Sequence, residues 1–192
     1  MTGRGPAILL VTTALVLLVG CTLSPTTQAP AAASPAAAGP SLGARTKTTG
    51  CQSVGGLPDP ACTPGAVDPR VTQATVVQTI CTSGWATSVR PPESVTEPIK
   101  RDEMRAYGLA GQRLADYELD HLVPLELGGA PADLANLWPE PWNGPANAHE
   151  KDAVENFLHQ RVCSGAMALA DAQHAIATNW LAVYQQNGLR PA

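Results

Sequence analysis

Apolar and polar residues divide this chain into three parts. Residues 7–19 are an apolar run broken only by Thr12 and Thr13, residues 21–49 are rich in Ala, Pro, Ser and Thr without a period, and residues 50–192 mix periodic stretches with turns. The middle part cannot bury enough apolar surface to offset the entropy of ordering it, so we expect a disordered tether. The last part is one domain's worth of chain and can bury one core.

Within residues 50–192 the pattern predicts helices and one hairpin. Apolar residues that recur at helical spacing predict helices at residues 69–80, 97–107, 145–162 and 169–184. Residues 117–123 alternate in part and are stopped by Pro124, which predicts a strand, and residues 136–138 are expected to form a brief return strand. The order helix, helix, hairpin, helix, helix predicts an α+β domain that is mainly helical.

The apolar run near the amino terminus is typical of an export signal. It is shorter than the roughly 20 residues that a spanning helix needs. It ends in Leu18-Val19-Gly20-Cys21, which resembles the lipobox of bacterial lipoproteins. The resemblance implies that residues 1–20 are removed and that acyl chains on Cys21 hold the protein at the outer face of the cell membrane. The alternative is a plain signal peptide with a chance cysteine after it.

Four cysteines follow Cys21, and an even number in an exported domain favours two disulfides. Three pairings are possible. Cys51 and Cys62 lie close together in a Pro/Gly-rich segment, so a local Cys51–Cys62 loop is the simplest choice, which leaves Cys81 with Cys163. A four-cysteine zinc site is the alternative, although the chain has no close Cys-x-x-Cys pair.

Charge bears on the class of partner. The chain has 12 Lys plus Arg and 16 Asp plus Glu, and removing residues 1–20 takes away Arg4 and no acid, so 11 minus 16 leaves a net charge of −5. Proteins that bind nucleic acid without sequence preference are normally basic. The acidic balance therefore counts against a nuclease.

One motif nevertheless indicates nuclease chemistry. Residues 120–129 read Asp-His-Leu-Val-Pro-Leu-Glu-Leu-Gly-Gly, and residues 136–139 read Asn-Leu-Trp-Pro ahead of a predicted helix. This pattern resembles the HNH, or ββα-metal, nuclease family. Residues 50–185 also resemble a group of exported actinobacterial-type proteins with an HNH-like core. The resemblance implies an HNH-like ββα motif, formed by the hairpin and the next helix, within a disulfide-stapled domain.

The resemblance also implies roles for particular residues. His121 would be the general base, a role suited to a pKa near neutrality. Asp120 would be a hard oxygen ligand for a divalent metal, with Mg²⁺ preferred and Mn²⁺ or Zn²⁺ as alternatives. Asn136 would hold the hairpin loop, and so the orientation of His121.

The second metal ligand is expected near the start of the helix that follows. His149 is the nearest match, and Asp152 lies one turn later on the same side. Asn143 or Asn147 could serve instead.

The leading hypothesis is therefore a membrane-anchored, extracytoplasmic nuclease that acts on nucleic acid and has no obligate protein partner. The runner-up is a catalytically inactive cell-envelope module in which Asp120 and His121 are a buried structural pair. A third reading is a metal-dependent hydrolase that acts on another envelope substrate.

The lipobox makes the first prediction. Replacing Cys21 with Ser removes the thiol that would carry the lipid, so we expect the variant to leave the membrane fraction. Cell fractionation and immunoblotting measure this. A Cys21→Ser protein that stays in the membrane fraction would contradict lipid anchoring.

Overall fold

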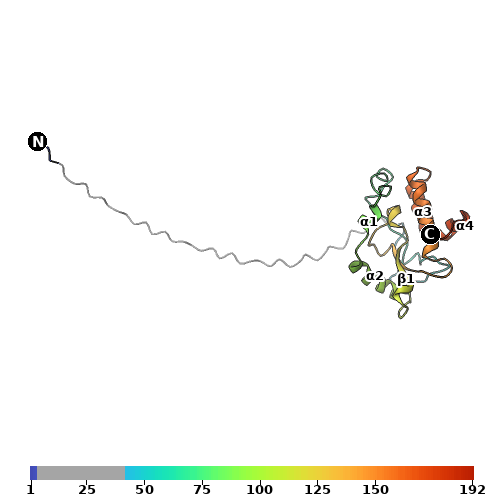
Figure 1. Ribbon diagram of the computed structural model, residues 1–192. Coiled ribbons are helices and arrows are strands. Elements are labelled where there is room, and N and C mark those ends of the chain that lie inside the picture. The colour runs from blue at the N-terminus through green and yellow to red at the C-terminus, as the bar shows by residue number, and fades with distance from the viewer. Residues whose placement is uncertain (4–41) are drawn as a thin grey trace. The chain divides into compact units, whose positions relative to one another are not determined.

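A computed structural model describes residues 1–3 and 42–192 of the chain (Figure 1). Most of the expected signal peptide, the expected lipid site at Cys21 and most of the expected tether lie outside the described residues. Among the described helices, none is long and apolar enough to cross a membrane.

The described residues form an α+β domain, as the sequence pattern predicts. It contains four α-helices: α1 (Trp85–Val89), α2 (Glu93–Ala106), α3 (Ala148–Cys163) and α4 (Leu169–Gln186). Strands β1 (Tyr117–His121) and β2 (Leu137–Pro141) pair as the one sheet of the described part, and two 3-10 turns, η1 (Leu114–Asp116) and η2 (Leu125–Leu127), flank β1.

The hairpin has an antiparallel register that runs from Tyr117 opposite Pro141 to His121 opposite Leu137. Alternate residues of a strand face the same side of a sheet. Glu118 and Asp120 of β1 therefore share a face with the residues opposite them on β2.

Helices α3 and α4 lie side by side in the structure (Figure 1). Helix α3 contributes Val154, Leu158 and Val162 to the core, and their spacing of four residues keeps them on one face. Ile176 and Trp180 of α4 belong to the same buried cluster. Trp138 of β2 also joins this cluster, so the hairpin is fixed to the helical core through β2.

The helix predicted at residues 69–80 is wrong, because this segment is a series of turns. Asp68 receives the backbone N–H and the guanidinium of Arg70 and does not cap a helix. The hydroxyl of Thr75 donates to the carbonyl of Arg70 and accepts the N–H of Thr72. Such local bonds from threonine compete with helical bonds. Helix α2, in contrast, begins four residues earlier than predicted.

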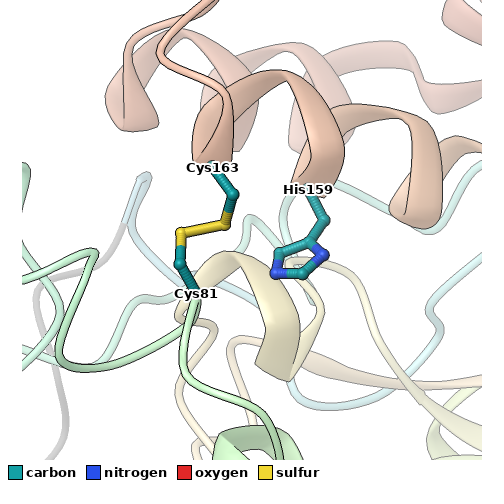
Figure 2. A group of neighbouring side chains, drawn as sticks. All are labelled: Cys81, His159 and Cys163. Carbon is teal, nitrogen blue, oxygen red and sulfur yellow. A yellow bond between two sulfur atoms is a disulfide. The ribbon is translucent and has the colours of Figure 1, made fainter.

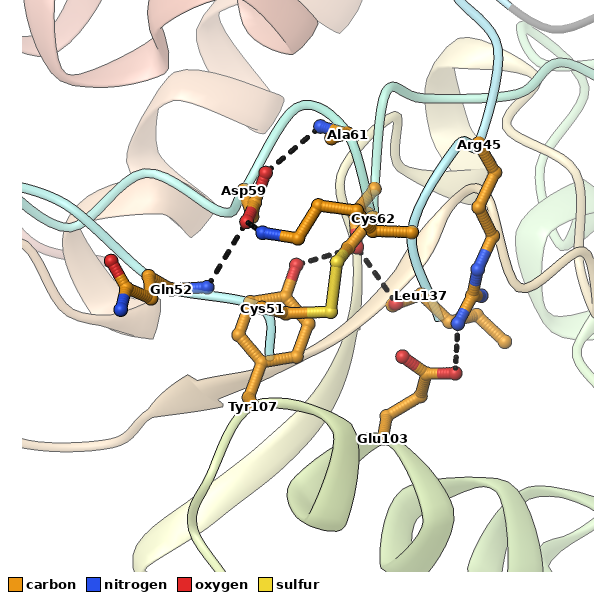
Figure 3. The surroundings of a disulfide bond; sticks show 11 residues. Arg45, Cys51, Gln52, Asp59, Ala61, Cys62, Glu103, Tyr107 and Leu137 are labelled. Carbon is orange, nitrogen blue, oxygen red and sulfur yellow. Dashed lines mark hydrogen bonds and ion pairs between the residues drawn. A yellow bond between two sulfur atoms is a disulfide. The ribbon is translucent and has the colours of Figure 1, made fainter. Parts of the chain in front are cut away.

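The carboxyl end of the expected tether is also corrected. Residues 42–49 contact the domain: the N–H of Thr46 donates to the carbonyl of Ala61, and Arg45 forms an ion pair of 2.9 Å with Glu103 (Figure 3). Lys47 pairs with Asp59 at 2.7 Å. Ionic and backbone partners hold this short polar segment, although its composition alone suggests disorder.

Both predicted disulfides are present. Cys51 bonds to Cys62 across 11 residues (Figure 3), and Cys81 bonds to Cys163 across 82 residues (Figure 2). The second bond ties the turns that precede α1 to the end of α3. The cysteines are therefore crosslinks and do not form the alternative zinc site.

The two crosslinks should differ in their effect on stability, because a longer closed loop restricts the unfolded chain more. The chain-entropy relation gives about 4.5 kcal/mol for the 82-residue loop and about 2.8 kcal/mol for the 11-residue loop. Urea unfolding of Cys81→Ser/Cys163→Ser and of Cys51→Ser/Cys62→Ser should show the larger loss for the first pair. Equal losses in unfolding free energy, or a larger loss for the Cys51–Cys62 pair, would contradict the larger stabilising effect expected of the Cys81–Cys163 crosslink.

Candidate functional site

A cleft of about 190 Å³ opens beside the hairpin, bounded by α1, β1, η2 and α3. Its ionisable lining is mostly acidic and consists of Glu118, Asp120, Glu126, Asp152 and Glu155, together with His121 and Arg90. The cleft therefore brings the expected base and two of the expected ligands, Asp120 and Asp152, to one place. Adjacent strand residues normally face opposite sides, yet both Asp120 and His121 line the cleft.

His121 is held in one orientation. Its side chain is only 6% exposed, and Nε2 lies 2.9 Å from the carbonyl oxygen of Pro131. A carbonyl can only accept, so in the neutral ring Nε2 carries the proton and Nδ1 carries the lone pair. Burial lowers the pKa of His121, which favours this neutral form. The imidazole therefore has the protonation state that a general base requires.

Asn136 holds the loop that supplies this carbonyl. Its side chain is fully buried; Nδ2 donates to the carbonyls of Val123 and Ala130, and Oδ1 accepts the N–H of Val123. Ala130 directly precedes Pro131, so these bonds fix the carbonyl that orients His121. This is the role that the resemblance implies for Asn136.

Gly129 allows the same loop to close. A Cβ at this position would lie 1.7 Å from the carbonyl oxygen of Val123, which no side chain can tolerate. Gly128, which precedes it, has φ of 74°, in the left-handed region that favours glycine.

Asp120 accepts two hydrogen bonds inside the fold. The indole N–H of Trp138 lies 2.9 Å from Oδ2, and the ammonium of Lys151 lies 2.8 Å from the same oxygen. Burial raises the pKa of Asp120, but the charge and hydrogen bond of Lys151 outweigh burial, and the pKa falls below its usual range. Asp120 is therefore ionised.

Lys151 is one of the residues of this site to which the sequence analysis assigns no role. It lies in the first turns of α3, its side chain is fully buried, and its ammonium reaches Asp120, Glu155 and the carbonyl of His121. Burial lowers the pKa of Lys151, but the charges of Asp120 and Glu155 outweigh burial and hold the pKa well above its usual range. The ammonium thus joins α3 to the end of β1.

Two further carboxylates lie beside Asp120 on the hairpin. Glu118 and Glu140 are directly opposite each other in the register, and Glu140 is 1% exposed. Burial, reinforced by the charge of Asp120, raises the pKa of Glu118 to about 8 and that of Glu140 well above its usual range. Neither glutamate was predicted to be part of the site.

The second-ligand candidates have different locations. Asp152 lines the cleft, where burial raises its pKa, whereas His149 is exposed, outside the cleft lining, with its ring 5.6 Å from that of Trp142. Asn147 caps α3 by accepting the N–H of Glu150. Among the residues expected to supply this ligand, the cleft therefore brings only Asp152 to Asp120.

A second group of possible ligands lies at the long disulfide (Figure 2). Cys81, His159 and Cys163 are close together, but the two sulfur atoms are bonded to each other. Nε2 of His159 lies 2.9 Å from the carbonyl oxygen of Ile80. This group is therefore a crosslink with a packed histidine.

Comparison with protein-family models, with curated proteins and with solved structures found no match to this chain. The resemblance to HNH nucleases therefore stands on the motif alone.

Removing the buried ammonium should be costly. In Lys151→Met the carboxylate of Asp120 stays buried without its cation, and the expected loss in unfolding free energy is about 3–5 kcal/mol. Adding Asp120→Asn should recover part of this loss, because the uncompensated charge is gone. Urea unfolding measures both.

The matched control is Lys47→Met, which removes a lysine from the half-exposed pair with Asp59 and should cost about 0–1 kcal/mol. If Lys151→Met lost no more than this control, the buried ammonium would not be essential to the fold.

Proposed function

We propose that this chain is a membrane-anchored, extracytoplasmic HNH-like nuclease that cleaves phosphodiester bonds with a divalent metal ion. The observation that carries the proposal is the single cleft that contains His121, Asp120 and Asp152. The order of the elements supports it, because β1, β2 and α3 follow one another as strand, strand and helix, as in a ββα motif.

The chain's residues support a hydrolytic role for His121. With Nε2 donating to the carbonyl of Pro131, the free lone pair of the neutral ring is at Nδ1, which would take the proton of the attacking water. Asn136 and Gly129 are positioning residues, because they hold the loop against which the imidazole rests.

The donor set fits a hard cation. Asp120 and Asp152 would offer carboxylate oxygens, the ligands that Mg²⁺ prefers. Trp138 and Lys151 both approach Oδ2 of Asp120, so Oδ1 would be the atom of Asp120 that binds the ion. A bound divalent ion supplies the positive charge that neutralises the phosphate and the leaving oxygen.

The charge of the cleft explains why a metal would be obligatory. Five acidic side chains line the cleft with Arg90 and His121, and Asp120 among them is ionised, so a phosphodiester would be repelled unless a cation lay between it and the protein. The lipid expected on Cys21 would hold this cleft outside the membrane, where the accessible substrate would be extracellular or incoming nucleic acid.

The second candidate is an inactive cell-envelope module. One observation favours it, since Lys151 already neutralises Asp120 within the fold. The same experiment separates the two candidates.

The test is cleavage of supercoiled plasmid DNA, and of RNA, by the full chain in mild detergent with Mg²⁺, Mn²⁺ or Zn²⁺. We expect cleavage that EDTA abolishes. Removing a general base costs about 10²–10⁴-fold in rate, so His121→Ala should be slower by that factor. Thermal melting of each variant verifies that it is folded.

The matched control is His174→Ala, which removes an exposed histidine of α4 that is remote from the cleft lining. It should cleave at the wild-type rate. Wild-type protein that is inactive with all three metals, or a His121→Ala variant that is as active as wild type, would reject the nuclease and leave the envelope module.

A further inference from the structure

Three carboxylates gather on one face of the hairpin. Glu118 and Asp120 are alternate residues of β1, and Glu140 lies directly across from Glu118 on β2. One ligand atom from each of these side chains lies within 4.8 Å of those of the other two. Like charges opposite each other on a sheet are destabilising, so the three carboxylates cannot all be ionised without a compensating positive charge.

Lys151 does not pair with all three carboxylates. An ammonium has three N–H donors, and those of Lys151 are taken by Asp120, Glu155 and the carbonyl of His121. Lys151 is the one buried lysine or arginine among the described residues, and it has no donor left for Glu140.

Glu140 is consequently without a partner. Its side chain is 1% exposed, and neither carboxylate oxygen has a hydrogen-bond partner among the residues that the structure describes. Burial disfavours the ionised form of such a carboxylate unless it is paired or bound to a metal. This buried, unpaired carboxylate lies against the ligand atoms of Glu118 and Asp120, which is an observation separate from the clustering of acids.

The spacing suits a divalent cation. Ca²⁺ binds oxygen at 2.3–2.6 Å, so two oxygens on one Ca²⁺ lie at most about 5 Å apart, and the triad falls within this limit. Mg²⁺, at 2.0–2.1 Å, spans at most about 4.2 Å and demands a closer set. Carboxylate oxygens are the ligands of both ions.

We propose that Glu118, Asp120 and Glu140, here called the carboxylate triad, form a divalent-cation site on the hairpin. The site differs from the ligand set that the HNH resemblance implies, because two of its three ligands are the unpredicted glutamates. A role of this site in catalysis rests on the proposed function. Metal binding by the triad, in contrast, is measured without any cleavage reaction.

The test is binding of Mn²⁺ to the full chain in detergent, followed by the loss of the free Mn²⁺ signal in electron paramagnetic resonance, with Ca²⁺ as competitor. We expect one Mn²⁺ per chain in wild type and displacement by Ca²⁺. Losing a residue that merely orients a metal ligand costs about 10–100-fold in affinity. Glu140→Gln and Glu118→Gln, which remove ligand charges but keep the side-chain shape, should each weaken binding by more than roughly 100-fold.

Thermal melting provides a second measurement. Mn²⁺ should raise the melting temperature of wild type, because a ligand that binds only the folded state stabilises it. It should not raise that of Glu140→Gln, and melting in EDTA verifies that this variant is folded.

The matched control is Glu93→Gln, which changes an exposed carboxylate of α2 outside the cleft lining and should bind Mn²⁺ as wild type does. No binding by wild type, or wild-type affinity in both glutamine variants, would overturn the triad. Loss of binding in Asp152→Asn, with wild-type affinity in the glutamine variants, would overturn it too and would place the ion at the ligands implied by the resemblance. Binding through the triad without nucleic-acid cleavage would support the site and reject only the nuclease.

Discussion

The ammonium of Lys151 is the interaction on which the site depends. It joins three acceptors that belong to two elements, since Asp120 and the carbonyl of His121 end β1 and Glu155 lies one turn farther along α3. The Lys151 side chain is fully buried, so breaking this contact would leave charges that the interior cannot solvate. The contact ties α3, which carries Asp152, to the end of β1.

A second, uncharged network fixes the other side of the cleft. Asn136 satisfies backbone groups on both sides of the loop between the strands, and the carbonyl of Pro131 then fixes the ring of His121. The side chains at the centre of the two networks, Asn136 and Lys151, are both fully buried, so the imidazole and Asp120 are held by contacts inside the fold.

The sequence predicted the parts of this arrangement that depend on local signals. Alternation and Pro124 marked the hairpin, and residue spacing gave the Cys51–Cys62 pair. Lys151 was missed because a lysine followed four residues later by a glutamate is typical of a solvent-exposed helix face. Glu140 was missed because it lies between two prolines, which suggest a turn, whereas β2 continues through both as an edge strand. Burial of these two residues is decided by tertiary packing, which has no periodic signature.

Charge is the quantity that connects the fold to its chemistry. The single positive charge of Lys151 neutralises about one of the negative charges around it. Two ionised carboxylates with oxygens 4.8 Å apart repel each other by about 3–4 kcal/mol at an effective dielectric constant of about 20. Protons on Glu118 and Glu140 remove this repulsion, consistent with the raised pKa of both groups, and a divalent cation removes it equally. Protons and a divalent cation would therefore compete for the same buried oxygens of the hairpin.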